Sequence, residues 1–180
     1  MSDLTALTPG TWNVDPAHST IGFTARHLMI TKVHGTFKTF TGSITVAADP
    51  LQSAVEATVE IASVDTGESN RDNHLRTNDF FSADTYPTMT LKSTGITAKG
   101  DDYVLTGDLT IKGVTKSVAF DLEFEGVAAD PWGGTRAGFV ASTEINRKDW
   151  GIEYNAALET GGVVIGDKVK LLLDIQAVRA

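Results

Sequence analysis

The stretch Val118–Glu125, which reads Val-Ala-Phe-Asp-Leu-Glu-Phe-Glu, decides the fold class of this chain. Apolar residues occupy every second position, and three of the four positions between them are acidic. Successive side chains of a β-strand point to opposite faces, so this period of two is typical of a strand with one buried face and one face in water. Strands of this kind form antiparallel sheets, which can be solvated on one side. The stretch therefore predicts an all-β protein.

The same alternation continues toward both ends of the chain. Segments that repeat it are residues 20–26, 54–61, 105–112, 139–145 and 168–176. Two less regular segments, 34–46 and 88–97, bring the number of expected strands to about eight. Within 34–46 the alternation shifts by one residue between Phe37 and Phe40, which predicts a β-bulge there.

Short turn sequences separate these segments, and we find no linker or internal repeat, so we expect a single domain over residues 1–180. An up-and-down barrel and a sandwich both fit the alternation. Two segments depart from it. A short helix is expected at about residues 70–79, where Ser69-x-x-Asp72 predicts an N-terminal cap. A long loop at about residues 146–163 is expected to cover one end of the barrel.

Composition excludes several classes of protein. The chain has no cysteine, which excludes a disulfide scaffold, a zinc–thiolate site, an iron–sulfur cluster and a cysteine nucleophile. Its net charge of −8 argues against sequence-independent binding to nucleic acid or to anionic lipid surfaces. No stretch approaches the roughly 18 apolar residues of a membrane span, and the N-terminus lacks a basic and apolar leader. We therefore expect a cytoplasmic protein without stable membrane insertion.

No catalytic signature is present: the chain lacks the G-x-S-x-G, H-E-x-x-H, P-loop and G-x-G-x-x-G patterns, and we expect no cofactor. Its four histidines are His18, His27, His34 and His74. Their spacing matches no zinc pattern, so no metal site is predicted.

Three polar residues are candidates for contact with a ligand. By parity His27 points inward at a strand end, where it is either a structural histidine or a contact to a ligand headgroup. Arg71 and His74 lie on the expected helix, either on a self-paired face in water or over the barrel mouth, where an arginine offers a fork of donors. In the run Asn146–Gly151 we expect an arginine–aspartate pair that locks a turn over the barrel end.

Several motifs, in order along the chain, carry a resemblance to a known family. They are WNVDPAHS at 12–19, FTARH at 23–27, VHGTF at 33–37, NRDNHLRTNDFF at 70–81, LTIKGVTK at 109–116 and INRKDWGI at 145–152. Over roughly residues 11–178 the chain resembles the YceI-like family of polyisoprenoid-binding, lipocalin-like β-barrel proteins. The resemblance implies an antiparallel eight-stranded barrel around a long apolar channel, and it also implies homodimers.

The functional hypothesis is a non-catalytic protein that binds, transports or stores a long lipid: a polyisoprenoid, an isoprenoid quinone or a fatty-amide-like lipid. The polar candidates at its mouth are His27, Arg71 and His74. The candidate apolar lining is Phe23, Phe37, Ile44, Val59, Leu109, Phe120, Phe139 and Leu171.

Two alternatives stay open at this point. One is an isomerase or hydrolase of a hydrophobic substrate that works through His27 or His74. The other is a structural or stress-response barrel without a ligand, in which the interior is filled by side chains.

Overall fold

The computed structural model describes residues 3–156 and 164–180, and the strands of this part form one antiparallel sheet. The strands are β1 (Gly10–Val14), β2 (Thr20–His27), β3 (Thr31–Phe37), β4 (Phe40–Val46), β5 (Ala54–Glu60), β6 (Val64–Asp65), β7 (Thr88–Lys99), β8 (Asp102–Ile111), β9 (Val114–Ala129), β10 (Thr135–Asn146) and β11 (Ile165–Arg179). The helix α1 covers Ser69–Leu75, and 3-10 turns cover η1 (Leu4–Ala6), η2 (Pro16–His18), η3 (Pro50–Gln52), η4 (Ile61–Ser63) and η5 (Arg147–Trp150).

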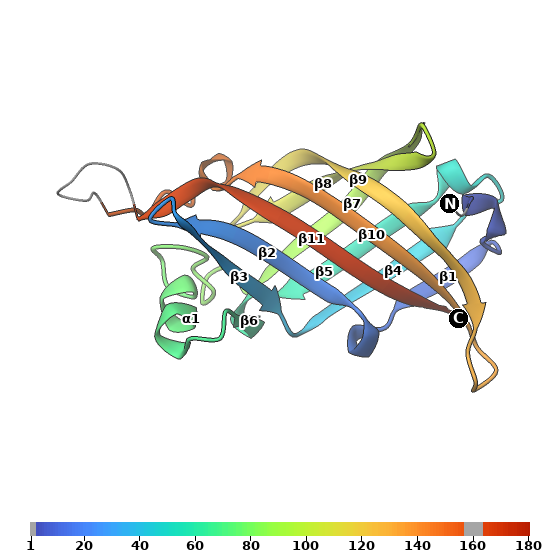
Figure 1. The fold of residues 1–180 in the computed structure, drawn as a ribbon, viewed down its shortest axis with the longest axis horizontal. Helices are drawn as coiled ribbons and strands as arrows, with labels where there is room; N and C mark the ends of the chain where they lie inside the picture. The colour runs from blue at the N-terminus through green and yellow to red at the C-terminus, as the bar shows by residue number, and fades with distance from the viewer. Residues whose placement is uncertain (1–2, 157–163) are drawn as a thin grey trace.

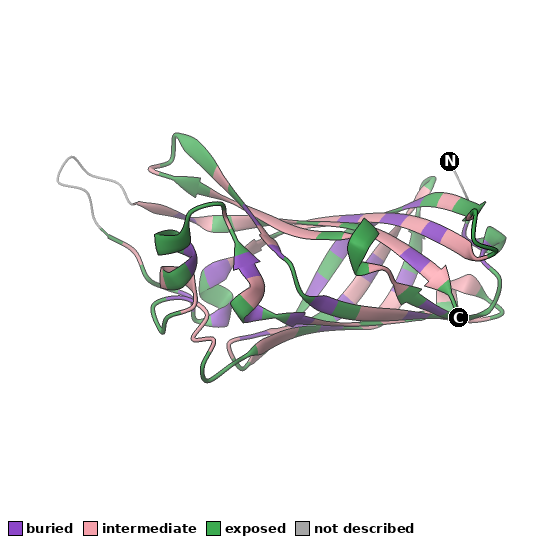
Figure 2. Ribbon diagram, turned by 90° about the horizontal axis from the view of Figure 1, so that it is seen from below, coloured by how far each residue is buried: buried purple, intermediate pink, exposed green. Residues whose placement is uncertain are grey.

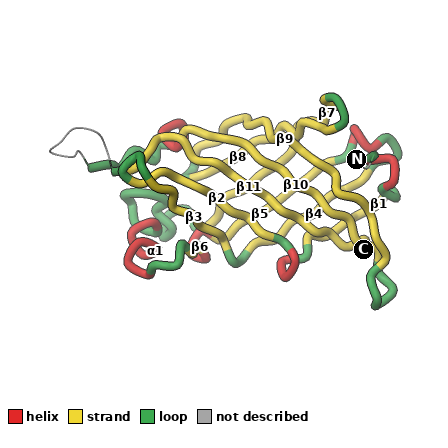
Figure 3. The backbone as a smooth tube through the Cα atoms, in the orientation of Figure 1, coloured by secondary structure: helices red, strands yellow, loops and turns green. Residues whose placement is uncertain are grey.

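The sheet closes on itself as an eight-stranded barrel (Figures 1 and 3). β1 and β2 both pair with β11, so they are two stretches of one barrel strand, interrupted by η2. β3 and β4 form a second divided strand, because β3 pairs with β2 while β4 pairs with β1 and β5. The pairing of β1 with both β4 and β11 completes the barrel. The prediction of an eight-stranded antiparallel barrel is confirmed.

The bulge predicted between Phe37 and Phe40 is wrong, because the strand is broken there. Both phenylalanines are buried, and Lys38 and Thr39 between them belong to no strand. The backbone N–H of Thr39 donates to Ser63 Oγ at 3.0 Å, and that of Lys38 donates to the Ser63 carbonyl at 3.2 Å. Hydrogen bonds to Ser63 of η4 thus replace strand pairing at this point. The extra residue lies in a break between β3 and β4 and not in a bulge.

The short helix is present but ends at Leu75, four residues before the predicted end. Glu68, rather than Ser69, caps it by accepting hydrogen bonds from the backbone N–H groups of the second and third following residues. Asp72 is buried and accepts from the backbone N–H and the hydroxyl of Thr66, at 2.9 and 2.6 Å. This contact fixes the helix against the loop before it, so α1 lies across one end of the barrel (Figure 1).

Inward-facing side chains fill most of the interior. Along β9 the apolar residues Val118, Phe120, Leu122 and Phe124 are all buried, while the residues between them are exposed. A similar alternation between more buried and less buried residues runs along much of β8, β10 and β11 (Figure 2). On β3, Gly35 makes room for the ring of Phe23, since a Cβ at Gly35 would stand 2.2 Å from Phe23 Cζ. Within the described residues, no helix is long and apolar enough to cross a membrane.

Candidate functional site: two apolar cavities in one barrel

The interior holds two cavities, arranged along the barrel. The first, of about 170 Å³, lies at the α1 end, where Leu75 of α1 contributes to its wall. The second, of about 100 Å³, lies toward the N-terminal end, where Leu4 and Leu7 contribute to its wall. Each is well above the roughly 10–15 Å³ that one water molecule occupies. Cavities walled by apolar side chains do not hold water well, so this space suits an apolar ligand.

The two cavities share four wall residues: Ile21, Ala57, Leu91 and Leu173. These residues come from four different strands, β2, β5, β7 and β11. They stand between the two cavities, and we call these four residues the waist. Ala57 is the smallest of them, so a larger side chain at its position would narrow the space between the two cavities.

All eight residues predicted as apolar lining lie on a cavity wall. Ile44 and Phe139 line the second cavity. The other six line the first: Phe23, Phe37, Val59, Leu109, Phe120 and Leu171. Their alternation with exposed residues was the signal that found them, and their contact with a ligand stays a prediction.

Arg147 carries the only charge among the described residues that line the first cavity. Its side chain is 5% exposed. Nε donates to the Gly166 carbonyl at 3.0 Å, and Nη1 donates to the carbonyls of Ile152 and Tyr154 at 2.8 and 2.9 Å. Nη2 is buried without a hydrogen-bond partner among the described residues, and the nearest carboxylate oxygen, on Asp167, is 3.7 Å away. Burial lowers the pKa of this guanidinium, although an arginine stays charged.

The segment after β10 places Arg147 in this position. Asn146 caps η5 by accepting from the backbone N–H of Lys148, and Gly151 ends the turn with a φ of 74°, a left-handed conformation that suits glycine. Trp150 is buried and donates from Nε1 to the Leu109 carbonyl at 3.0 Å. The described part of the predicted loop thus closes over the cavity, while residues 157–163 lie outside the described residues.

The arginine–aspartate pair expected within Asn146–Gly151 is wrong in its partner. Asp149 is exposed, and Arg147 binds backbone carbonyls instead. The turn is locked as expected, but sequence reasoning missed that Arg147 is buried and contributes to the wall of the first cavity. The signal was an arginine two residues beyond Ile145, an inward-facing position of β10, and three residues before the buried Trp150.

None of the three predicted polar candidates lines either cavity. The inward position predicted for His27 is wrong: it is exposed at the hairpin between β2 and β3, beyond the last lining residue of that strand, Ala25. Arg71 is exposed and donates to the hydroxyl and carbonyl of Thr66, at 2.7 and 2.9 Å. His74 lies at the rim.

The His74 ring bonds one neighbour and packs against two others. Its Nε2 is 2.8 Å from Asp79 Oδ2, and its centroid is 5.0 Å from those of Phe80 and Tyr154. Of these residues Phe80 lines the first cavity. His74 therefore stands one layer of side chains away from the interior.

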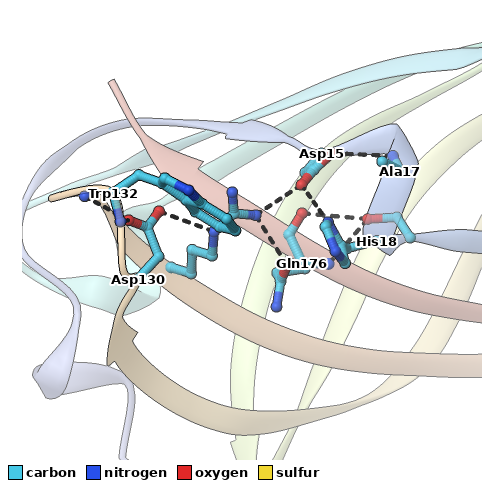
Figure 4. A network of polar contacts seen from close by, with 9 residues as sticks. Asp15, Ala17, His18, Asp130, Trp132 and Gln176 are labelled. Carbon is cyan, nitrogen blue, oxygen red and sulfur yellow. Dashed lines mark hydrogen bonds and ion pairs between the residues drawn. The ribbon is translucent and has the colours of Figure 1, made fainter.

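A polar network at the other end of the barrel surrounds Arg136 (Figure 4). Arg136 Nη1 donates to Asp15 Oδ2 at 2.7 Å and to Gln176 Oε1 at 3.0 Å, and Nε donates to Asp130 Oδ2 at 3.0 Å. His18 Nδ1 is 2.8 Å from the same Asp15 oxygen. The hydrogen bond from Arg136, helped by His18, lowers the pKa of Asp15 to about 2. This network joins the break between β1 and β2 to β10 and β11.

Among the described residues, no group of three or more His, Asp or Glu side chains is placed to hold a metal ion. His18 pairs with Asp15, His34 Nδ1 is 2.9 Å from the hydroxyl of Thr24, and His74 pairs with Asp79.

Comparison with known proteins identifies relatives over nearly the whole chain. Residues 12–177 match the family described as the YceI-like domain. A UPF0312 protein of Staphylococcus epidermidis is 44% identical over 161 residues, which cover 88% of this chain and 92% of the relative.

Two solved structures share the fold. The crystal structure of Burkholderia cenocepacia BcnA is 26% identical, with a TM-score of 0.79 over 91% of this chain and 98% of that one. A structure from Saccharophagus degradans, described as a polyisoprenoid-binding domain implicated in plant cell wall breakdown, is 18% identical, with a TM-score of 0.73 over 96% of this chain and 100% of that one.

Proposed function

The chain belongs to the YceI-like family, and on that premise we propose that its barrel binds a long isoprenoid-type lipid and carries or stores it. The observation that carries this proposal is the pair of apolar cavities that share the four wall residues of the waist. The name of the Saccharophagus degradans structure, a polyisoprenoid-binding domain with the same fold, supports the choice of ligand class.

The energetics favour a chain of this type. Burial of a hydrocarbon chain releases on the order of 0.8 kcal/mol per CH₂ group, so a long chain gains its affinity from the wall without many polar contacts. Most of the wall consists of Phe, Leu, Ile, Val and Ala side chains. The ligand runs along the barrel and passes Ala57 at the waist.

In this proposal Arg147 determines which end of the ligand lies at the α1 end of the barrel. Arg147 lines the first cavity, and its Nη2 is a buried donor without a hydrogen-bond partner among the described residues; such a donor costs free energy unless an acceptor reaches it. An oxygen of the headgroup, such as a quinone carbonyl or a phosphate oxygen, supplies that acceptor. The headgroup then lies at the α1 end, and the chain extends toward the N-terminal end.

The same lining supports binding rather than catalysis. The described wall of the first cavity contains no histidine and no carboxylate that would move a proton. His74 and Asp79 form a pair at the rim, but the ring of Phe80 packs against His74. The predicted homodimer and the predicted cytoplasmic location stay predictions.

The waist offers a direct test with a matched control. Ala57→Phe adds an aromatic ring at the waist, between the two cavities, whereas Ala54→Phe adds the same ring to the exposed face of the same strand. We expect Ala57→Phe to weaken binding of a long polyprenyl quinone at least tenfold and to leave binding of a quinone with one or two isoprene units within about twofold. Ala54→Phe binds both as wild type does.

Fluorescence or calorimetric titration of the purified variants measures these affinities. Equal affinity of wild type and a folded Ala57→Phe variant for the long quinone would contradict a ligand that spans the waist. Failure of wild type to bind either quinone, polyprenyl phosphate or polyprenol would contradict the proposal as a whole.

A further inference from the structure

The hairpin between β2 and β3 exposes apolar side chains at its tip. Met29 is 52% exposed and Ile30 is 75% exposed. The tip stands at the α1 end of the barrel (Figure 1), and the backbone N–H of Leu28 donates to the Val164 carbonyl, just before β11. The hairpin is therefore held in place although its tip side chains point into solvent.

The backbone conformation at the tip is unfavourable for the residues that form it. Leu28 and Met29 have φ values of 54° and 61°, and the backbone N–H of Ile30 donates to the His27 carbonyl at 3.2 Å. A turn with positive φ at both central residues favours Asn-Gly or Gly-Gly. Apolar residues at these positions are a poor choice for making the turn, so their exposed side chains call for a different explanation.

Behind the tip, basic side chains gather on the outer face of three neighbouring strands. Arg26 of β2 stands directly opposite Lys32 of β3, and like charges in directly opposite positions destabilise a sheet. Lys170 of β11 lies opposite Thr24, two residues along β2 from Arg26. Within the described part of the chain, none of these three cations has an ion pair within 4.0 Å. We call Arg26, Lys32 and Lys170 the basic collar.

Two nearby acidic groups pair with other cations. Glu144 of β10 stands opposite Lys170, but its carboxylate is 3.7 Å from Lys168 Nζ, and Asp167 is 3.3 Å from Lys148 Nζ. The three cations of the basic collar therefore lie together without an ion pair of their own within the described residues, on a chain whose net charge is −8. The net charge of the whole molecule argues against binding to anionic surfaces, but it does not give the local charge of the face that carries the basic collar.

From these observations we infer that the tip and the basic collar dock the barrel on an anionic lipid bilayer. Met29 and Ile30 enter the boundary between headgroups and acyl chains, while the collar lies against the anionic headgroups. The tip adjoins the first cavity, since Ala25 and Ile165 beside it line that cavity. The inference goes beyond the proposed function by naming the surface from which a lipid enters or leaves, and docking is measurable without any ligand.

Co-sedimentation with vesicles tests the docking. We expect the full chain to bind vesicles that contain phosphatidylglycerol at low ionic strength, to leave pure phosphatidylcholine vesicles in the supernatant, and to dissociate as salt is raised. Met29→Ser with Ile30→Ser lowers the bound fraction at least fivefold. Trp132→Ser, at the hairpin of the opposite end and 79% exposed in wild type, leaves it unchanged.

The Lys32→Glu variant tests whether vesicle binding can be lost without a loss of stability. It replaces a repulsive cross-strand pair with an attractive one, so the melting temperature stays equal or rises while vesicle binding falls more than fivefold. Equal binding of wild type to both kinds of vesicle, or wild-type binding by the tip variant, would overturn the inference. Quinone titration of the same variants in solution stays as in wild type, which distinguishes failure of docking from failure of the proposed function.

Discussion

The two ends of the barrel each hold an arginine with little exposure, and the two arginines are satisfied in different ways. Arg136, at the N-terminal end, is 19% exposed and binds two carboxylates within 3.0 Å. Arg147, at the α1 end, is 5% exposed, binds three backbone carbonyls and keeps one N–H group without a partner among the described residues. The hydrogen bonds that Arg136 donates to Asp15 and Asp130 raise the pKa of Arg136, whereas burial lowers that of Arg147.

This difference in environment underlies the different roles that the proposed function gives to the two arginines. Arg136 has its charge compensated by two nearby carboxylates, and its partners join segments that are far apart in the sequence, so its contacts account for its presence. Arg147 is held mainly by neutral carbonyls, its nearest carboxylate is that of Asp167 at 3.7 Å, and its Nη2 has no hydrogen-bond partner among the described residues. A buried donor without an acceptor is rare in proteins, and under the proposed function an oxygen of the ligand supplies the acceptor.

Replacement of Arg147 has the largest expected effect. Arg147→Met leaves the carbonyls of Ile152, Tyr154 and Gly166 without their donor, two of them in buried hydrogen bonds, so we expect a loss of about 3–5 kcal/mol in the free energy of unfolding. Urea denaturation measures it. The neighbouring Lys148→Met is the control: Lys148 is half exposed, and its ion pair with Asp167 contributes at most about 1 kcal/mol. Equal losses of unfolding free energy in the two variants would show that the contacts of Arg147 stabilise the fold no more than an exposed ion pair does.

Replacement of Arg136 has a smaller expected effect, because its partners reach water more easily. Arg136→Met leaves Asp15 and Asp130 without their shared donor, and we expect a lower urea midpoint, with a smaller decrease than for Arg147→Met. Lipid titration distinguishes the two ends, since Arg136→Met keeps the affinity for quinone. A loss of quinone affinity in a folded Arg136→Met variant would contradict the division of roles.

The smallest effect concerns acid stability at the N-terminal end. The folded-state pKa of Asp15, about 2, is below its ordinary value of 3.8, so its contacts stabilise the fold above pH 3.8 and lose this contribution as the pH falls toward 2. We expect Asp15→Asn to cost about 1–2 kcal/mol near neutral pH and progressively less below pH 3.8. Urea midpoints of wild type and variant across this range measure the difference. A difference that does not change with pH would show that the charge of Asp15 contributes nothing.

Alternation along the chain was sufficient to predict the antiparallel strands and the side chains that line the interior, whereas the choice of a barrel over a sandwich came from the resemblance to the YceI-like family. Phe120 and Phe139 lie on cavity walls because side-chain direction in a strand follows position alone. At two places the alternation alone did not predict the structure correctly. Between Phe37 and Phe40 a bulge and a break both absorb one residue, and the contacts that favour the break come from Ser63, far along the chain. At His27 parity gives the face of the strand but not the position of the barrel rim.

The polar part of the site was less predictable for a different reason. His27, Arg71 and His74 are polar residues in motifs, but their local partners or exposure keep them outside the cavities. Arg147 enters the interior because a tight turn, ended by Gly151, directs its side chain toward carbonyls on both flanking segments. Such a position depends on tertiary contacts that no local pattern contains.

The central claim is that the joined cavities hold one long apolar chain. Native mass spectrometry of freshly purified protein, followed by organic extraction, tests it most directly. We predict one lipid per chain, with an isoprenoid-type tail and an oxygen-bearing headgroup, and a lower occupancy in Ala57→Phe than in Ala54→Phe. Protein that carries no lipid and takes up no added polyprenyl quinone, polyprenyl phosphate or polyprenol would contradict the claim.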